Sequence, residues 1–147
     1  MLASRLMNPA QESAVPKWRL FYHFVWATKN RELLVTPDVE LRLHGMLRKE
    51  AEKFFAPLFY VNGMPDHIHI LASVRPAISP AKFAQQLKGS SSHFMTHQLQ
   101  LGFEWQDDYG VFSVSEKDVP RIIEYIKNQK QHHAAQTLIN EWEDLGE

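Results

Sequence analysis

The 147-residue chain has no cysteine, and its apolar residues form no long uninterrupted run. The absence of cysteine excludes a disulfide scaffold, a thiolate zinc site and a cysteine nucleophile. No segment approaches the roughly 20 apolar residues that a membrane-spanning helix needs. Residues 1–15 also lack a continuous apolar segment of the signal-peptide type. We therefore expect a cytoplasmic protein that has no membrane partner.

Neither sign of charge is in excess. The chain has 16 Lys and Arg residues against 17 Asp and Glu residues, and its formal net charge is −1. This balance argues mildly against a nucleic-acid binder, because phosphates are contacted by Lys and Arg. A local cluster of Lys and Arg residues can still bind nucleic acid when the net charge of the whole chain is near zero. The alternative is that these Lys and Arg side chains are simply solvated and bind no partner. The residues expected to cluster around a nucleic-acid site are Lys29, Arg31, Lys82, Lys88, Lys127 and Lys130.

The apolar pattern predicts one domain at 17–133, after a flexible leader at 1–16 and before a C-terminal helical extension at 134–147. Strands are expected at 18–26, 58–62, 67–74 and 109–115, and helices at about 37–54, 80–99 and 119–133. A bend is expected near Gly89 in the second helix. The extension has apolar residues at helical spacing, which predicts docking on a neighbouring element or on a partner chain.

The order of the expected elements is β-α-β-β-α-β-α. This order predicts an α+β protein with the ferredoxin-like split βαβ arrangement, in which two helices pack on one face of an antiparallel sheet. The other face remains vacant, so the last helix, which carries Tyr125, is expected near it.

Two histidines one residue apart, His67 and His69, form the strongest candidate site. In a strand they point to one face, while Ile68 and Ile70 point to the other. Tyr125 and Gln129 are four residues apart and share a face of a helix. If that helix crosses the histidine face, two imidazoles, an amide oxygen and a phenol converge. The alternative is a half-exposed polar strand face with no ligand.

Other histidines carry weaker signals. His132 and His133 lie one turn beyond Gln129, so either could replace Gln129 as a third ligand, or both could belong to a solvated helix end. His23, His44, His93 and His97 have no spacing that indicates a site.

The segment from Met64 to Leu71 resembles the His-hydrophobic-His motif of the HUH single-tyrosine transposases. These are the enzymes of single-strand-transposing insertion sequences and the REP-associated tyrosine transposases. Four further segments resemble the same family in the same order: Tyr22 to Lys29, Leu87 to Ser92, Trp105 to Val114, and Tyr125 to Gln129. The resemblance covers about residues 20–133.

The resemblance implies a homodimeric, Mg²⁺- or Mn²⁺-dependent nuclease and strand transferase acting on hairpin-bearing single-stranded DNA. It implies that Tyr125 is the nucleophile of a 5′-phosphotyrosine link, and that His67, His69 and Gln129 hold the metal. Imidazoles suit Zn²⁺, Cu²⁺ or Ni²⁺ better than Mg²⁺, so the identity of the ion stays open. Whether Tyr125 serves its own subunit or its partner's also stays open.

Two other function classes are compatible with these residues. A non-catalytic module on the same fold could bind single-stranded nucleic acid by stacking bases on exposed aromatic side chains. A different metal hydrolase could use the His-X-His pair. The chain is short for a TIM barrel, which typically needs about 250 residues. No histidine here begins the His-X-Ser/Thr motif of a two-histidine phosphoesterase.

Overall fold

The computed structural model describes residues 17–135 and 139–143 of the chain. The predicted leader at 1–16 lies outside the described residues, as do 136–138 and 144–147 of the predicted extension. Within the two described ranges, no helix has both the length and the apolar character to cross a membrane.

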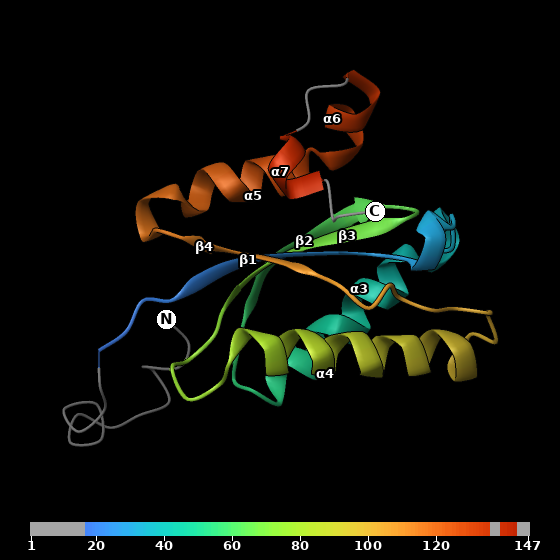
Figure 1. Ribbon diagram of the computed structural model, residues 1–147, viewed down its shortest axis with the longest axis horizontal. Coiled ribbons are helices and arrows are strands. Elements are labelled where there is room, and N and C mark those ends of the chain that lie inside the picture. Colours follow the sequence, from blue (N-terminus) through green and yellow to red (C-terminus); the bar gives the residue numbers. More distant parts are fainter. Residues whose placement is uncertain (1–16, 136–138, 144–147) are drawn as a thin grey trace.

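Four antiparallel strands form one sheet at the centre of the molecule (Figure 1). Helix α3 (Pro37–Glu52) connects β1 to β2, and helix α4 (Pro80–His93) lies between β3 and β4 in the chain. The strand order is β2-β3-β1-β4. This order with these crossovers is the predicted ferredoxin-like split βαβ fold. The strands are β1 (Phe21–Ala27), β2 (Leu58–Met64), β3 (His67–Ser73) and β4 (Gly110–Val114).

Helices α3 and α4 cover one face of the sheet with an apolar core (Figure 1). Alternate residues of the two central strands point into it, among them Phe24, Ile68 and Ile70, each at most 1% exposed. Leu43 and Phe83 meet them from the two helices. Burial of one such side chain stabilises the fold by about 1.5–3 kcal/mol, so this layer is a main source of the stability of the sheet.

The predicted bend of the second helix near Gly89 is wrong. Helix α4 runs through Gly89, and the geometry changes only at Phe94–Gln98, which form a π-helical turn. A methyl group at Gly89 would meet no atom within 4 Å, so nothing there requires a glycine. The helix starts as predicted, with the Ser79 hydroxyl accepting a hydrogen bond from the Lys82 backbone N–H at 3.1 Å.

Gly63 positions the strand that carries the histidines. It pairs with Ile68 in the β2–β3 hairpin. A Cβ at this position would lie 2.2 Å from the His67 carbonyl oxygen. Only glycine therefore allows β2 to approach the backbone of His67 this closely.

Three helices lie over the other face of the sheet: α5 (Val119–Lys127), α6 (Gln129–Ala135) and α7 (Asn140–Glu143) (Figure 1). The single helix predicted at 119–133 is interrupted at Asn128, whose φ and ψ of −98° and 25° end α5. Trp142 is buried with Ile122 and Tyr125. The described part of the extension therefore docks on its own domain.

Candidate metal and tyrosine site

Two imidazoles of β3 project toward α5, α6 and α7 rather than into the apolar core. His67 and His69 are 2% and 0% exposed. Their Nε2 atoms face one carboxylate, that of Glu143 in α7. His67 Nε2 lies 3.0 Å from Oε1, and His69 Nε2 lies 3.1 Å from Oε2. The structure thus brings both histidines to the face that strand alternation predicted.

The second nitrogen of each imidazole has a different partner. His67 Nδ1 lies 2.7 Å from a carboxylate oxygen of Asp66, whose other oxygen is 3.6 Å from the Arg31 guanidinium. His69 Nδ1 lies 2.8 Å from Nε2 of His23, a fully buried residue of β1. These contacts fix both rings so that their Nε2 atoms point into the site.

Tyr125 and Gln129 approach the same point from the helices above. The Tyr125 hydroxyl donates to Glu143 Oε2 at 2.5 Å and accepts from the Ile139 backbone N–H at 3.1 Å. Gln129 is fully buried. Its Oε1 is 3.3 Å from His67 Nε2, and its Nε2 donates to Glu143 Oε2 at 3.3 Å. The four residues singled out in the sequence therefore converge around one carboxylate.

The convergence shifts the ionisation of three groups. Burial by itself would lower the pKa of His67, but its hydrogen bonds with Asp66 and Glu143 outweigh burial and raise the pKa to about 9. Burial would raise the pKa of Glu143, yet its hydrogen bonds with His67 and His69 hold that pKa well below the usual range. Burial and the hydrogen bond to Glu143 raise the pKa of Tyr125 to about 12. Without a cation, the phenol is fully protonated at neutral pH.

The two histidines considered as alternative third ligands have different positions. His133 Nε2 lies 3.1 Å from Gln129 Oε1 and 3.4 Å from Glu143 Oε1. The ring of His132 instead stacks on Tyr125, with 4.8 Å between ring centroids. His133 thus borders the same set of donor atoms, whereas His132 packs against the tyrosine ring.

The donor set suits a divalent cation. Ligating atoms of His67, His133 and Glu143 all lie within 4.8 Å of one another. Neighbouring ligands about 2.1 Å from an octahedral ion lie roughly 3 Å apart, and Nε2 of His67 and of His133 lie 3.0 and 3.4 Å from Glu143 Oε1. Two buried atoms, His69 Nε2 and Glu143 Oε1, have ion-pair contacts of 3.1 and 3.0 Å with Glu143 Oε2 and His67 Nε2, but these contacts lack the alignment of a hydrogen bond. A cation between these atoms would satisfy both, and the carboxylate supplies the oxygen ligand that Mg²⁺ and Mn²⁺ favour.

The predicted basic cluster is divided by the sheet. Lys82 and Lys88 belong to α4, in the layer opposite α5 to α7 (Figure 1). Lys88 donates to backbone carbonyls of the loop before β4, including that of Gln106 at 2.6 Å. The structure therefore does not bring these two lysines to the histidine face, because the helix that carries them packs on the apolar face.

Two of the other predicted basic residues, Arg31 and Lys130, contact residues on the histidine side of the sheet. Arg31 donates to the Glu143 backbone carbonyl at 2.8 Å. Lys130 donates to the Gly63 carbonyl at 3.2 Å and to the Glu40 carboxylate at 2.9 Å. Lys127 is an exposed residue at the end of α5. Lys29 pairs with Glu104 at 3.1 Å, just beyond the end of β1.

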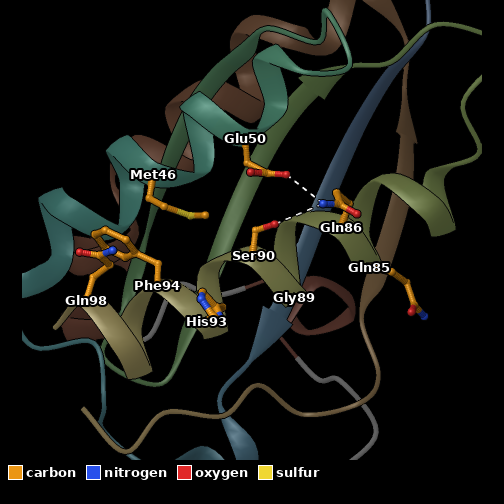
Figure 2. Close-up of a pocket in the computed structure, with 9 residues that line it drawn as sticks. All are labelled: Met46, Glu50, Gln85, Gln86, Gly89, Ser90, His93, Phe94 and Gln98. Carbon is orange, nitrogen blue, oxygen red and sulfur yellow. Dashed lines mark hydrogen bonds between the residues drawn. The ribbon is translucent and has the colours of Figure 1, made fainter. Parts of the chain in front are cut away.

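Two cavities differ in their relation to this site. A groove of about 580 Å³ lies between α3 and α4 (Figure 2) and contains none of the predicted site residues. Its polar groups bond one another, as Gln86 donates to both Glu50 and Ser90. A second cavity, of about 470 Å³, is lined by His23 and Trp142 together with residues of β4 and α5. The second cavity therefore opens beside the histidines.

Comparison with known proteins agrees with this geometry. A family model described as "Transposase IS200 like" matches residues 16–129. The chain belongs to the IS200-like transposase family. The ISDra2 transposase TnpA of Deinococcus radiodurans is 30% identical over 119 residues, which cover 76% of this chain and 85% of that protein. The IS200 transposase of Salmonella typhimurium is 30% identical over 130 residues, which cover 84% of this chain and 85% of that protein.

Solved structures agree with membership of the IS200-like family. A candidate transposase from Deinococcus radiodurans superposes with a TM-score of 0.59 at 31% identity, covering 78% of this chain and 98% of that one. A REP-associated tyrosine transposase bound to a REP hairpin superposes with a TM-score of 0.62 at 16% identity, covering 81% and 74%. The second similarity supports the fold alone.

Sequence reasoning missed Glu143 and His23. Glu143 lies in an acidic stretch near the C-terminus, and no motif links it to the histidines. His23 did carry a signal. In the split βαβ fold the first and third strands are neighbours, and the observed register puts His23 two residues along the ladder from His69 on the same face. A search for polar residues that point to the same face of the two central strands would have found His23.

Proposed function

We propose that this member of the IS200-like family cleaves and rejoins single-stranded DNA through a 5′-phosphotyrosine link at Tyr125. One observation carries the proposal: the Tyr125 hydroxyl bonds the same carboxylate that His67 and His69 face. A nucleophile and a set of cation ligands thus share one buried site. The hairpin bound by the REP-associated relative favours hairpin-bearing DNA as the substrate.

A divalent cation, Mg²⁺ or Mn²⁺, would be held by Nε2 of His67 and His69 with Oε1 of Gln129. Glu143 would add a carboxylate oxygen, and His133 lies close enough to substitute for Gln129. When bound, the cation polarises the scissile phosphate and stabilises a phenolate.

Tyr125 supplies the atom that forms the new bond. Its phenolic oxygen attacks the scissile phosphorus, the P–O3′ bond breaks, and the departing 3′ oxygen takes up a proton. The phenolic proton leaves along the hydrogen bond to Glu143 Oε2. Without a cation this transfer is strongly uphill, because the pKa of Tyr125 is raised to about 12 while that of Glu143 is lowered. The resting site therefore keeps the nucleophile protonated.

The substrate strand would reach Tyr125 past the basic residues on this side of the sheet. Arg31 contacts both Asp66 and Glu143, and Lys127 and Lys130 flank Gln129 in the sequence. These three residues are the proposed phosphate contacts. We also propose that the protein is a homodimer. Within one chain, Tyr125 lies beside His69 of the same chain.

The test is incubation of the full chain with a hairpin-bearing single-stranded oligonucleotide and Mn²⁺, followed by a denaturing gel. The wild type and a Tyr109→Phe control should form a covalent protein–DNA adduct, and Tyr125→Phe should form none while still binding the oligonucleotide. Cleavage that persists in Tyr125→Phe would show that water is the nucleophile. Binding without any wild-type adduct would instead favour a non-catalytic DNA-binding module.

A further inference from the structure

A third buried imidazole lies behind the candidate metal site. His23 of β1 and His69 of β3 point to the same face of two neighbouring strands, since His23 pairs with Leu71 in the ladder. Diagonal neighbours of this kind lie within reach of long side chains. The two rings stack at 28° with 5.1 Å between centroids, and both residues are fully buried. The contact is therefore fixed by the register of the sheet.

One nitrogen of each ring takes part in the contact. His23 Nε2 lies 2.8 Å from His69 Nδ1. A hydrogen bond between two neutral imidazoles needs a proton on one nitrogen and a lone pair on the other. Both residues are fully buried, and a charge on either ring would be costly there. A neutral pair that shares one proton across this contact avoids that cost.

His67 provides the comparison within the same site. Its Nδ1 meets the charged carboxylate of Asp66, the usual kind of partner for a metal-ligating histidine. His69 has no carboxylate at its Nδ1 and has His23 instead. Only a lone pair on His23 Nε2 lets His69 carry its proton on Nδ1 and present the Nε2 lone pair to a cation.

We propose that His23 is a positioning residue whose Nε2 accepts the Nδ1 proton of His69 and so holds the His69 Nε2 lone pair toward the cation. This inference rests on the cation site proposed above. The rest of the His23 environment is aromatic, with Trp142 at 5.0 Å and Phe112 at 6.0 Å between ring centroids. Its Nδ1 has no hydrogen-bond partner within the described residues.

A side chain needed only for packing would be apolar at this position. Burying a nitrogen without a partner costs free energy, and an aliphatic residue among aromatic neighbours would avoid that cost. A histidine at position 23 is explained if its Nε2 accepts the hydrogen bond from His69. The packing and positioning roles therefore predict different results for different substitutions.

The experiment measures the Kd for Mn²⁺ by calorimetry on the full chain. His23→Gln keeps an oxygen acceptor near the place of Nε2, whereas His23→Leu removes the acceptor. His23→Leu should weaken Mn²⁺ binding by about 10–100-fold, the effect of losing such a partner in known metal sites. His23→Gln should stay within about threefold of wild type if the acceptor is what matters. Without metal, urea unfolding should show that His23→Leu is at least as stable as His23→Gln.

Equal Mn²⁺ affinity in His23→Leu and wild type would overturn the inference, as would equal losses in the Leu and Gln variants. His23→Asn, whose side chain is too short to reach His69, replaces His23→Leu if the latter fails to fold. Wild type and His67→Ala serve as references. If His67→Ala loses Mn²⁺ binding while the His23 variants bind Mn²⁺ like wild type, the cation site is supported and the role of His23 is rejected. A wild type that binds no Mn²⁺ rejects the cation site and the role of His23 together.

Discussion

The two faces of the sheet are both buried, but they are buried by opposite chemistry. On the α3–α4 face, Ile68 and Ile70 of β3 meet aromatic and aliphatic side chains. On the α5–α7 face, His67 and His69 of the same strand meet an amide, a phenol and a carboxylate. Consecutive residues of one strand thus contribute to two different interiors.

The difference between the two faces separates the side chains that stabilise the fold from the side chains of the candidate site. Apolar burial on the first face stabilises the sheet without any specific ligand. The second face buries charged and polar groups that are held mainly by one another, as Glu143 is by His67 and His69, and removing such groups from water costs free energy. The apolar layer therefore supports a polar layer that, in the proposed function, binds a cation and DNA.

The largest expected effect comes from His67→Ala on the polar face. We expect Mn²⁺ affinity to fall by more than about 100-fold, since a direct ligand is removed, and adduct formation to become undetectable. The urea unfolding free energy without metal should also fall, by about 3 kcal/mol below pH 6.5, because the raised pKa of His67, about 9, stabilises the fold there. Unchanged calorimetric Mn²⁺ binding would show that His67 holds no cation.

Ile70→Ala is the matched change on the apolar face of the same strand. Ile70 is fully buried, and such truncations cost about 2–5 kcal/mol. Urea unfolding should show this loss, while the remaining folded protein keeps wild-type Mn²⁺ affinity. If Ile70→Ala weakened Mn²⁺ binding as much as His67→Ala does, the two faces would not be separable.

Glu143→Gln tests the residue at the centre of the polar face. A neutral amide is a weaker ligand than a carboxylate for Mg²⁺ and Mn²⁺, so we expect Mn²⁺ affinity to fall by roughly tenfold. The pKa of Tyr125 should move down from about 12, because the hydrogen bond to the carboxylate helps to raise it; ultraviolet titration of the phenol would measure this. Faster adduct formation in Glu143→Gln would mean that the carboxylate competes with the substrate and does not ligate the cation.

The pH dependence of stability without metal involves one group on each side of the sheet. Burial lowers the pKa of His44 in α3 to about 4. As pH falls, His44 therefore becomes protonated in the unfolded chain at a higher pH than in the folded protein. The unfolding free energy should therefore fall as pH drops from about 6.5 to 4, by up to about 3 kcal/mol. The raised pKa of His67, about 9, stabilises the fold fully below about pH 6.5, and this stabilisation is lost as pH rises to 9.

Two substitutions separate these pH contributions. His44→Gln should reduce the loss of stability on the acid side, where His23, with a pKa of about 3, also contributes. His67→Ala should flatten the alkaline side, as measured by urea unfolding in the presence of a chelator. A wild-type stability that is constant across the whole range would contradict both assignments.

The fold could be predicted because its signals are local. Apolar periodicity, capping residues and element order determined the split βαβ arrangement, and strand alternation placed Ile68 and His67 on opposite faces. The helix break at Asn128 had no such signal, since Tyr125 to His133 has no proline or glycine. At the break, the Asn62 side chain of β2 donates to the backbone carbonyls of Ile126 and Lys127, a contact between distant segments that sequence periodicity does not report.

The site could be predicted only as far as its motifs extend. His67, His69, Tyr125 and Gln129 lie in two short segments with recognisable spacing. Glu143 reaches the site through the docking of α7, a contact between segments distant in the sequence. The division of the basic residues was missed for a similar reason, because Lys82 and Lys88 follow α4 to the apolar face.

The central claim is that Tyr125 becomes covalently linked to DNA, and peptide mass spectrometry tests it most directly. Trypsin cuts after Arg121 and Lys127, which releases the segment Ile122 to Lys127 with Tyr125 as its only tyrosine. After reaction with the oligonucleotide and Mn²⁺ and digestion by nuclease, this peptide should carry a nucleotide attached through its 5′ phosphate. A nucleotide found on another peptide, or cleaved DNA with this peptide unmodified, would contradict the claim.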